Sequence, residues 1–84
     1  NYNVESGLYR MPEGMTIPSH HHAHWCQVFV VRGTMEVQAD GEEPHLIAAG
    51  GYYFVEPGDT HRETAVEDSL LLVICEEERQ EFRR

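Results

Sequence analysis

Four histidines stand within five positions of this 84-residue chain, between residues 20 and 24. Side chains alternate between the two faces of a strand, so on an extended segment His20, His22 and His24 share one face. Two imidazoles at this spacing can bind one metal ion, and a third ligand must then come from another strand. His61, just after a turn, is the candidate. Because the tract is internal and runs into an apolar strand, we favour a metal site over an engineered or solvated histidine tract.

The segments around these histidines have the pattern of short strands. Residues 34–39 alternate polar and apolar side chains, and the Asp40-Gly41 pair that follows suits a tight type I′ hairpin turn. No stretch before the last nine residues has a helical apolar period. The tail, residues 76–84, has the charge spacing for a turn or two of helix, although a solvated end anchored by Phe82 is the favoured interpretation. We predict an all-β antiparallel barrel or sandwich.

Two predicted strands, residues 28–31 and 70–74, are apolar on both faces. Such a strand needs a cover on its outer face as well as a core on its inner face. The cover we expect is a second copy of the chain, packed against Phe29, Val31 and residues 70–74 as a homodimer. A single domain of this length also gains stability from a partner or a bound metal.

Composition excludes several classes of function. Fifteen acidic residues against six basic ones give a formal net charge of −9, which repels nucleic acid and anionic membranes. All six basic residues are arginine, so lysine Schiff-base chemistry is excluded. The longest apolar run, residues 70–75, is too short to span a bilayer. Cys26 and Cys75 form no CxxC pair and no leader precedes the first strand, so we expect reduced thiols and a cytoplasmic location.

The segment from Gly14 to Gly33 resembles the first motif of the cupin superfamily. Five residues separate Gly14 from His20, one separates His20 from His22, three separate His22 from position 26, and six follow before Gly33. Residues in this order are typical of the family's metal-binding strand. The spacing matches throughout.

Residues 50–65 resemble the second cupin motif, with Gly50, Gly58 and His61 at matching positions. Glu56 fills the usual proline slot, and an alanine stands where the motif usually has asparagine. The resemblance implies one cupin domain of the cupin 2 type over residues 1–84, folded as a small antiparallel β-barrel or jelly roll.

The resemblance also implies one Fe, Mn, Ni or Zn ion held by His20, His22 and His61. Where most relatives carry a metal-binding glutamate, this chain has Cys26. In the motif's register Cys26 points into the barrel, either as a thiolate ligand, as a neutral thiol beside a three-histidine centre, or as core filler. A bulge before the strand would instead bring Gln27 inward as an amide ligand.

Other candidate residues are expected outside the ligand set. We place His24 at the rim beside the ligands, His45 on the surface at a strand start, and Cys75 in the core or an interface. A substrate carboxylate would need a cation to bind it, and the candidates are three arginines, Arg10, Arg32 and Arg62.

Three neutral imidazoles leave a divalent ion its full charge and open positions, so a bound water or substrate oxygen is polarised. The three-histidine arrangement resembles thiol and diketone-cleaving dioxygenases, and other cupins isomerise or open sugars. A small metalloenzyme acting on an oxygen-rich or thiol-bearing small molecule follows from this resemblance. The alternative is a non-catalytic metal- or ligand-binding sensor module, because function belongs to the site and not to the fold.

Overall fold

Eight β-strands make up the part of the chain that the computed structural model describes, residues 4–21 and 24–76. They confirm the predicted all-β fold. The described residues contain no helix that is long and apolar enough to cross a membrane. Of the tail, residues 76–84, Glu76 ends the last strand and residues 77–84 lie outside the described residues. The strands are β1 (Val4–Met11), β2 (Thr16–His21), β3 (Cys26–Arg32), β4 (Thr34–Ala39), β5 (His45–Ala48), β6 (Tyr52–Val55), β7 (Thr60–Ala65) and β8 (Ser69–Glu76).

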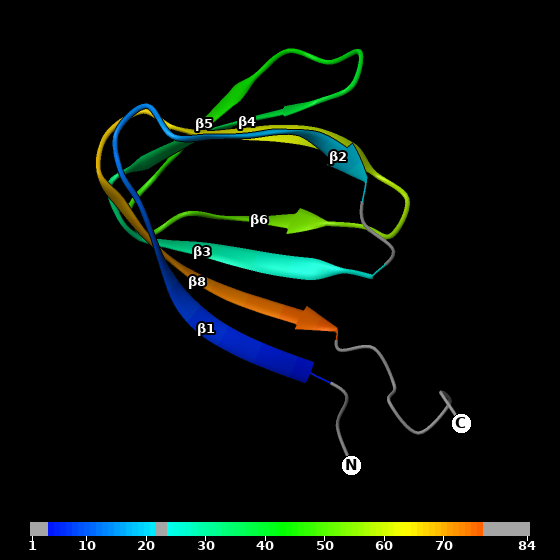
Figure 1. The fold of residues 1–84 in the computed structure, drawn as a ribbon, viewed down its shortest axis with the longest axis horizontal. Coiled ribbons are helices and arrows are strands. Elements are labelled where there is room, and N and C mark those ends of the chain that lie inside the picture. The colour runs from blue at the N-terminus through cyan, green and yellow to red at the C-terminus, as the bar shows by residue number, and fades with distance from the viewer. Residues whose placement is uncertain (1–3, 22–23, 77–84) are drawn as a thin grey trace.

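The strands form two four-stranded sheets that face each other (Figure 1). One sheet has the order β1-β8-β3-β6 and the other the order β2-β7-β4-β5. Every pairing is antiparallel. Chain neighbours such as β6 and β7 lie in different sheets, so the fold is a jelly roll of the kind predicted.

The hairpin between β4 and β5 is confirmed, but its predicted type I′ turn is wrong. A type I′ turn needs a positive φ at both central residues. Gly41 has a φ of 77°, whereas no described residue other than glycine has a positive φ, Asp40 included. Residues 40–44 form a longer loop because Pro44 has no amide hydrogen to extend the ladder, which begins at His45 opposite Val37.

Gly33 joins β3 to β4 at a position that only glycine fits. Its φ is 89°, and a Cβ there would overlap the carbonyl oxygen of Asp68 and the side chain of Ser69. The close approach lets the Ser69 hydroxyl accept a hydrogen bond from the amide of Thr34 at 3.1 Å. The last glycine of the first motif therefore ties the β3–β4 turn to the start of β8.

The core lies between the two sheets. Cys26, Val28 and Val30 of β3 are buried while Phe29 and Val31 are exposed, so the predicted inward register of this strand is confirmed. The core cluster also contains Met11, Met35, Ala65 and Leu71.

The outer face of the β1-β8-β3-β6 sheet is apolar as well. Phe29 lies with its ring centroid 5.9 Å from that of Tyr52, its register partner on β6. Trp25 stacks on Phe54 at the same distance, 5.9 Å. Leu8 on β1 and Val31 on β3 are exposed on this sheet too. We call this surface, which comprises Leu8, Phe29, Val31, Tyr52 and Phe54, the outer apolar face.

Met35 tests the core, because it has 0% exposed surface. We expect Met35→Ala to lower the free energy of unfolding by about 3 kcal/mol, since it leaves a cavity between the sheets. Urea denaturation measures this loss. The matched control is Met15→Ala, at a side chain that is 48% exposed, which should cost about 0.5 kcal/mol or less. Equal losses in the two variants would contradict this placement of the core.

Candidate metal site

A bulge in β2 brings His20 opposite His61 of β7. Ile17 pairs with Glu63 and His20 with His61, so β2 has one residue more than β7 in this stretch. The bulge includes Pro18, which cannot donate to a ladder and is tolerated here because β2 is an edge strand. Residues paired directly across two strands belong to the same face of the sheet. The backbone register therefore places His20 directly across from His61, as the predicted ligand pair requires.

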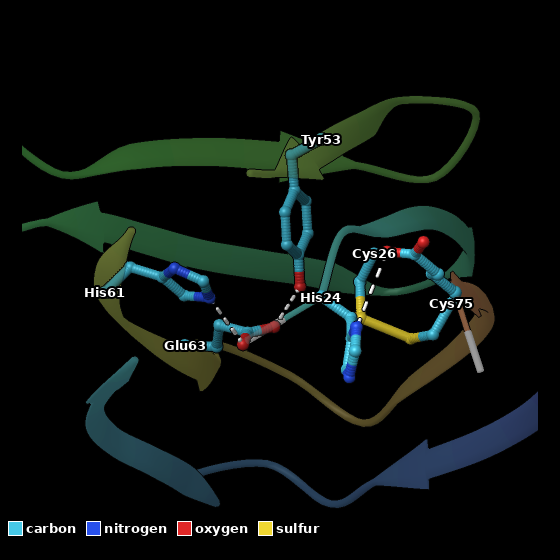
Figure 2. Close-up of a disulfide and its surroundings, with 7 residues drawn as sticks. His24, Cys26, Tyr53, His61, Glu63 and Cys75 are labelled. Atoms are coloured by element: carbon cyan, nitrogen blue, oxygen red, sulfur yellow. Dashed lines mark hydrogen bonds and ion pairs between the residues drawn. A yellow bond between two sulfur atoms is a disulfide. The ribbon is translucent and has the colours of Figure 1, made fainter. Parts of the chain in front are cut away.

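His61 and Glu63 are successive inner residues of β7, and they are 4% and 7% exposed. Nε2 of His61 lies 3.1 Å from Oε2 of Glu63. The hydroxyl of Tyr53, on β6 in the opposite sheet, donates a hydrogen bond to the other carboxylate oxygen, Oε1. Figure 2 shows the three side chains meeting between the sheets. The interior of the barrel therefore holds a polar cluster of an imidazole, a carboxylate and a phenol.

Tyr53 acts as a hydrogen-bond donor in this cluster. Burial raises the pKa of its hydroxyl above the ordinary value, and the negative charge of Glu63 and the hydrogen bond to it raise this pKa further. The phenol therefore keeps its proton at neutral pH and keeps donating to Glu63.

Cys26 and Cys75 form a disulfide between β3 and β8. The two residues are direct partners in the antiparallel register, with their Cα atoms 4.2 Å apart. The expectation of reduced thiols is wrong for this structure, because the strand register places the two sulfur atoms together. A bonded sulfur has no thiolate to offer a metal. Cys26 can join the ligand set only after reduction.

Gln27 lies on the face of β3 opposite to Cys26. Cys26, Val28 and Val30 are the buried residues of β3, so Gln27 is not turned inward as a bulge before the strand would require. Instead the Gln27 amide donates a hydrogen bond to the backbone oxygen of Tyr53 at 3.4 Å. The structure does not bring Gln27 into the barrel with His61.

The remaining candidate residues lie at the rim of the barrel, on its surface, or outside the described residues. Nδ1 of His24 is 3.5 Å from Oε1 of Glu76 at the end of β8, with both side chains half-exposed, which is a rim position. His22 lies outside the described residues. His45 is exposed at the start of β5. The three arginines considered for substrate binding, Arg10, Arg32 and Arg62, are exposed.

A cavity of about 300 Å³ opens beside this cluster. Its wall is mostly apolar and includes Val28, Val55 and Leu71, together with the Cys26–Cys75 disulfide. Glu63 is the one buried titratable side chain among the described residues that line it. The space suits a small molecule with an apolar part and one polar end directed at Glu63.

The donor types near His61 fit a divalent transition metal. An imidazole nitrogen and a carboxylate oxygen are ligands that iron, manganese, nickel and zinc accept. The residues whose side chains the structure describes form no group of three or more potential ligands. The side chains of residues 18–21 and all of residues 22–23 are outside that description.

Sequence reasoning missed Glu63 and Tyr53. The alternation of β7 contains a signal for Glu63, because it stands two residues after His61 and so shares its face. Tyr53 carries no such signal, since it reaches the cluster from the opposite sheet.

Comparison with known proteins identifies the domain type. The family model for the cupin domain matches residues 7–75. No curated protein matches the chain. An RmlC-like cupin from Shewanella frigidimarina has a similar structure, with a TM-score of 0.83, 24% identity, and coverage of 98% of this chain and 73% of that one. KdgF from a Halomonas species gives a TM-score of 0.83 and 23% identity over 98% of this chain and 77% of that one.

The DMSP lyase DddQ from Ruegeria pomeroyi gives a TM-score of 0.81 and 21% identity over 95% of this chain, which spans 41% of that one. At such identities the likeness to these structures shows the shared fold.

The disulfide yields a stability prediction. Cys26 and Cys75 are separated by 49 positions, and closing a loop of that length removes unfolded-state entropy worth about 4 kcal/mol. We expect a thiol reductant to lower the free energy of unfolding of the wild type by about this amount. The matched control is the double variant Cys26→Ala with Cys75→Ala, on which reductant should have no effect. Denaturation curves that reductant leaves unchanged for both proteins would contradict the bond.

Proposed function

This chain belongs to the cupin-domain family, and on that premise we propose that it binds one divalent transition metal ion, either Fe, Mn, Ni or Zn. The ligands in this proposal are His20, His22 and His61. The observation that carries it is the strand register, which pairs His20 with the buried His61 across β2 and β7. His22, two positions after His20, has the spacing to share its face. The proposal takes residues 1–84 as one cupin domain.

The side chains around the site prepare it for a small substrate. His61 is held in place by the inner face of β7 and by the carboxylate of Glu63. The wall of the neighbouring cavity is mostly apolar, which suits the apolar part of a small substrate. A metal bound by these histidines would polarise a substrate oxygen or sulfur atom next to the cavity.

We propose a small mononuclear-metal enzyme that acts on an oxygen-rich or thiol-bearing molecule, as a dioxygenase or an isomerase. One of the structures similar to this chain is a DMSP lyase, which supports turnover of a small molecule on this fold. The net charge of −9 repels nucleic acid and anionic membranes, so the proposal includes neither as a partner.

The second candidate is a binding or sensor module without turnover. The wall of the cavity favours this candidate, because among the described lining residues Glu63 is the one buried titratable side chain. One such group is a small set for catalysis by proton transfer. The number of metal positions left open separates the two candidates, since substrate activation needs at least one of them.

A homodimer is the second part of the proposal. The outer apolar face exposes two aromatic pairs and neighbouring aliphatic side chains on one sheet. A contiguous apolar surface of this kind is typical of an interface, and a two-fold axis allows it to cover itself. A second copy therefore supplies the cover that the sequence pattern requires.

The proposed cytoplasmic location now depends on the disulfide. It was expected together with two reduced cysteines, whereas the structure bonds these cysteines to each other. Disulfides persist in oxidising compartments and are rare in the cytosol. A cytoplasmic location therefore requires that this bond be reduced there.

Metal content tests the proposed function. We expect protein purified without an affinity column to hold close to one metal ion per chain, and His61→Ala to lose most of it because one imidazole ligand is gone. Elemental analysis measures the content. The matched control is His45→Ala, an exposed histidine on β5 that should leave occupancy unchanged. Full occupancy in His61→Ala, or loss confined to His45→Ala, would show that the site is wrongly assigned.

Light scattering tests the dimer. We expect the wild type to have the mass of two chains, and Phe29→Arg to shift it to one chain because a charge enters the outer apolar face. Leu46→Arg is the control, because Leu46 is 67% exposed on β5 of the other sheet. A wild type with the mass of one chain at working concentration would refute the dimer.

A further inference from the structure

The disulfide between Cys26 and Cys75 forms part of the wall of the cavity between the sheets. Both cysteines line this cavity, as Glu63 does from the opposite sheet (Figure 2). The cavity reaches the surface of the barrel, because the exposed side chains of Tyr9 and Met15 line it as well. A small molecule that enters the cavity therefore meets the two sulfur atoms in its wall.

The two cysteines form a close pair across β3 and β8. Their Cα atoms are 4.2 Å apart. Direct partners in an antiparallel ladder are about 4.5 Å apart where they exchange no hydrogen bonds and about 5.5 Å apart where they do. Cys26 and Cys75 therefore belong to the narrower kind of pair, whose side chains lie closest together. Two bonded sulfur atoms fit at this separation, whereas two unbonded sulfur atoms repel each other at covalent distance and need more space.

The backbones of β3 and β8 are held together on both sides of the disulfide. On one side the ladder continues with Gln27 opposite Ile74. On the other side the amide of Glu76 donates a hydrogen bond to the carbonyl oxygen of Trp25 at 3.0 Å. Each strand is also paired on its other edge, β8 with β1 and β3 with β6. The strands therefore cannot move apart when the S–S bond breaks, and the sulfur atoms separate by rotation of the side chains.

The cavity is the space into which a released thiol can turn. Val28 follows Cys26 on the inner face of β3, and Val55 is the direct partner of Cys26 on β6. Both valines are 3% exposed, and a packed interior of this kind has no room for a displaced sulfur atom. The cavity of about 300 Å³ lies open beside them. A thiol turned into it would fill part of its volume and add a polar group to a mostly apolar wall.

We propose that Cys26 and Cys75 are a redox switch for this cavity. While they are bonded, the cavity binds a small uncharged molecule with an apolar body, and once they are reduced it binds that molecule more weakly. The mostly apolar wall and the net charge of −9, which opposes an anion, define this class of ligand. A dithiol is the reductant: the S–S bond breaks, the two sulfur atoms take up two electrons and two protons, and the dithiol becomes a disulfide.

The switch also acts in the other direction. By linkage, a ligand in the cavity protects the disulfide from reduction to the same extent as reduction weakens the ligand. The inference rests on the proposed function only in taking this cavity as the space for the substrate, and it needs no metal.

The test uses benzene as the probe, because benzene enters apolar cavities of about 150 Å³. Titration of the metal-free wild type is followed by the NMR signals of its methyl groups. We expect benzene to shift the signals of Val28 and Leu71 in the cavity wall, with about 10-fold weaker binding after reduction by dithiothreitol, a coupling of ordinary size. The signals of Val31, exposed on the outer apolar face, report binding elsewhere.

The matched control is the double variant Cys26→Ala with Cys75→Ala, which has neither the cross-link nor a thiol. It should bind benzene as tightly as the oxidised wild type, with or without dithiothreitol. Binding as weak as that of the reduced wild type would overturn the switch, because loss of the cross-link alone would then explain the effect. If the variant does not fold, nuclear Overhauser contacts of the cysteine β-protons decide. New contacts with Ile17 across the cavity on reduction support the switch, and unchanged contacts reject it.

The outcomes separate the switch from the proposed function. An oxidised wild type that binds no benzene, equal affinity before and after reduction, or loss of the fold on reduction would each overturn the switch. One metal ion per chain would then leave the proposed function standing. A wild type that holds no metal would overturn the proposed function, while redox-dependent binding of benzene would still support the switch.

Discussion

The antiparallel pairing of β7 with β2 and β4 is the interaction on which the core and the site both depend. Ala65 of β7 pairs with the fully buried Met35 and belongs to the core. Two and four residues earlier on the same face stand Glu63 and His61, the latter opposite His20. Since side chains alternate with a period of two, a slip of one residue would turn all these groups to the surface. The register that builds the core is therefore the register that builds the candidate site.

Two connections of different kinds hold the barrel around this face. The hydrogen bond from Tyr53 to Glu63 joins the two sheets through buried polar groups. The Cys26–Cys75 disulfide joins two strands within one sheet and borders the same cavity. Buried polar groups cost stability unless their partners are in place, so a ligand that engages them stabilises the folded chain. In a domain of 84 residues, a bound ion and a covalent cross-link would each add substantially to a small core.

The sequence by itself determined the features that depend on neighbouring residues. Alternation along β4, the inward register of β3 and the motif spacing around His20 and His61 predicted the all-β fold and the cupin family, because a strand's period and a motif's spacing are local. Only the tertiary structure decided what meets across strands: the bond between Cys26 and Cys75, the bulge at Pro18, and the approach of Tyr53 to Glu63. Each depends on which strands pair and in which register, and that is set by packing the whole barrel at once.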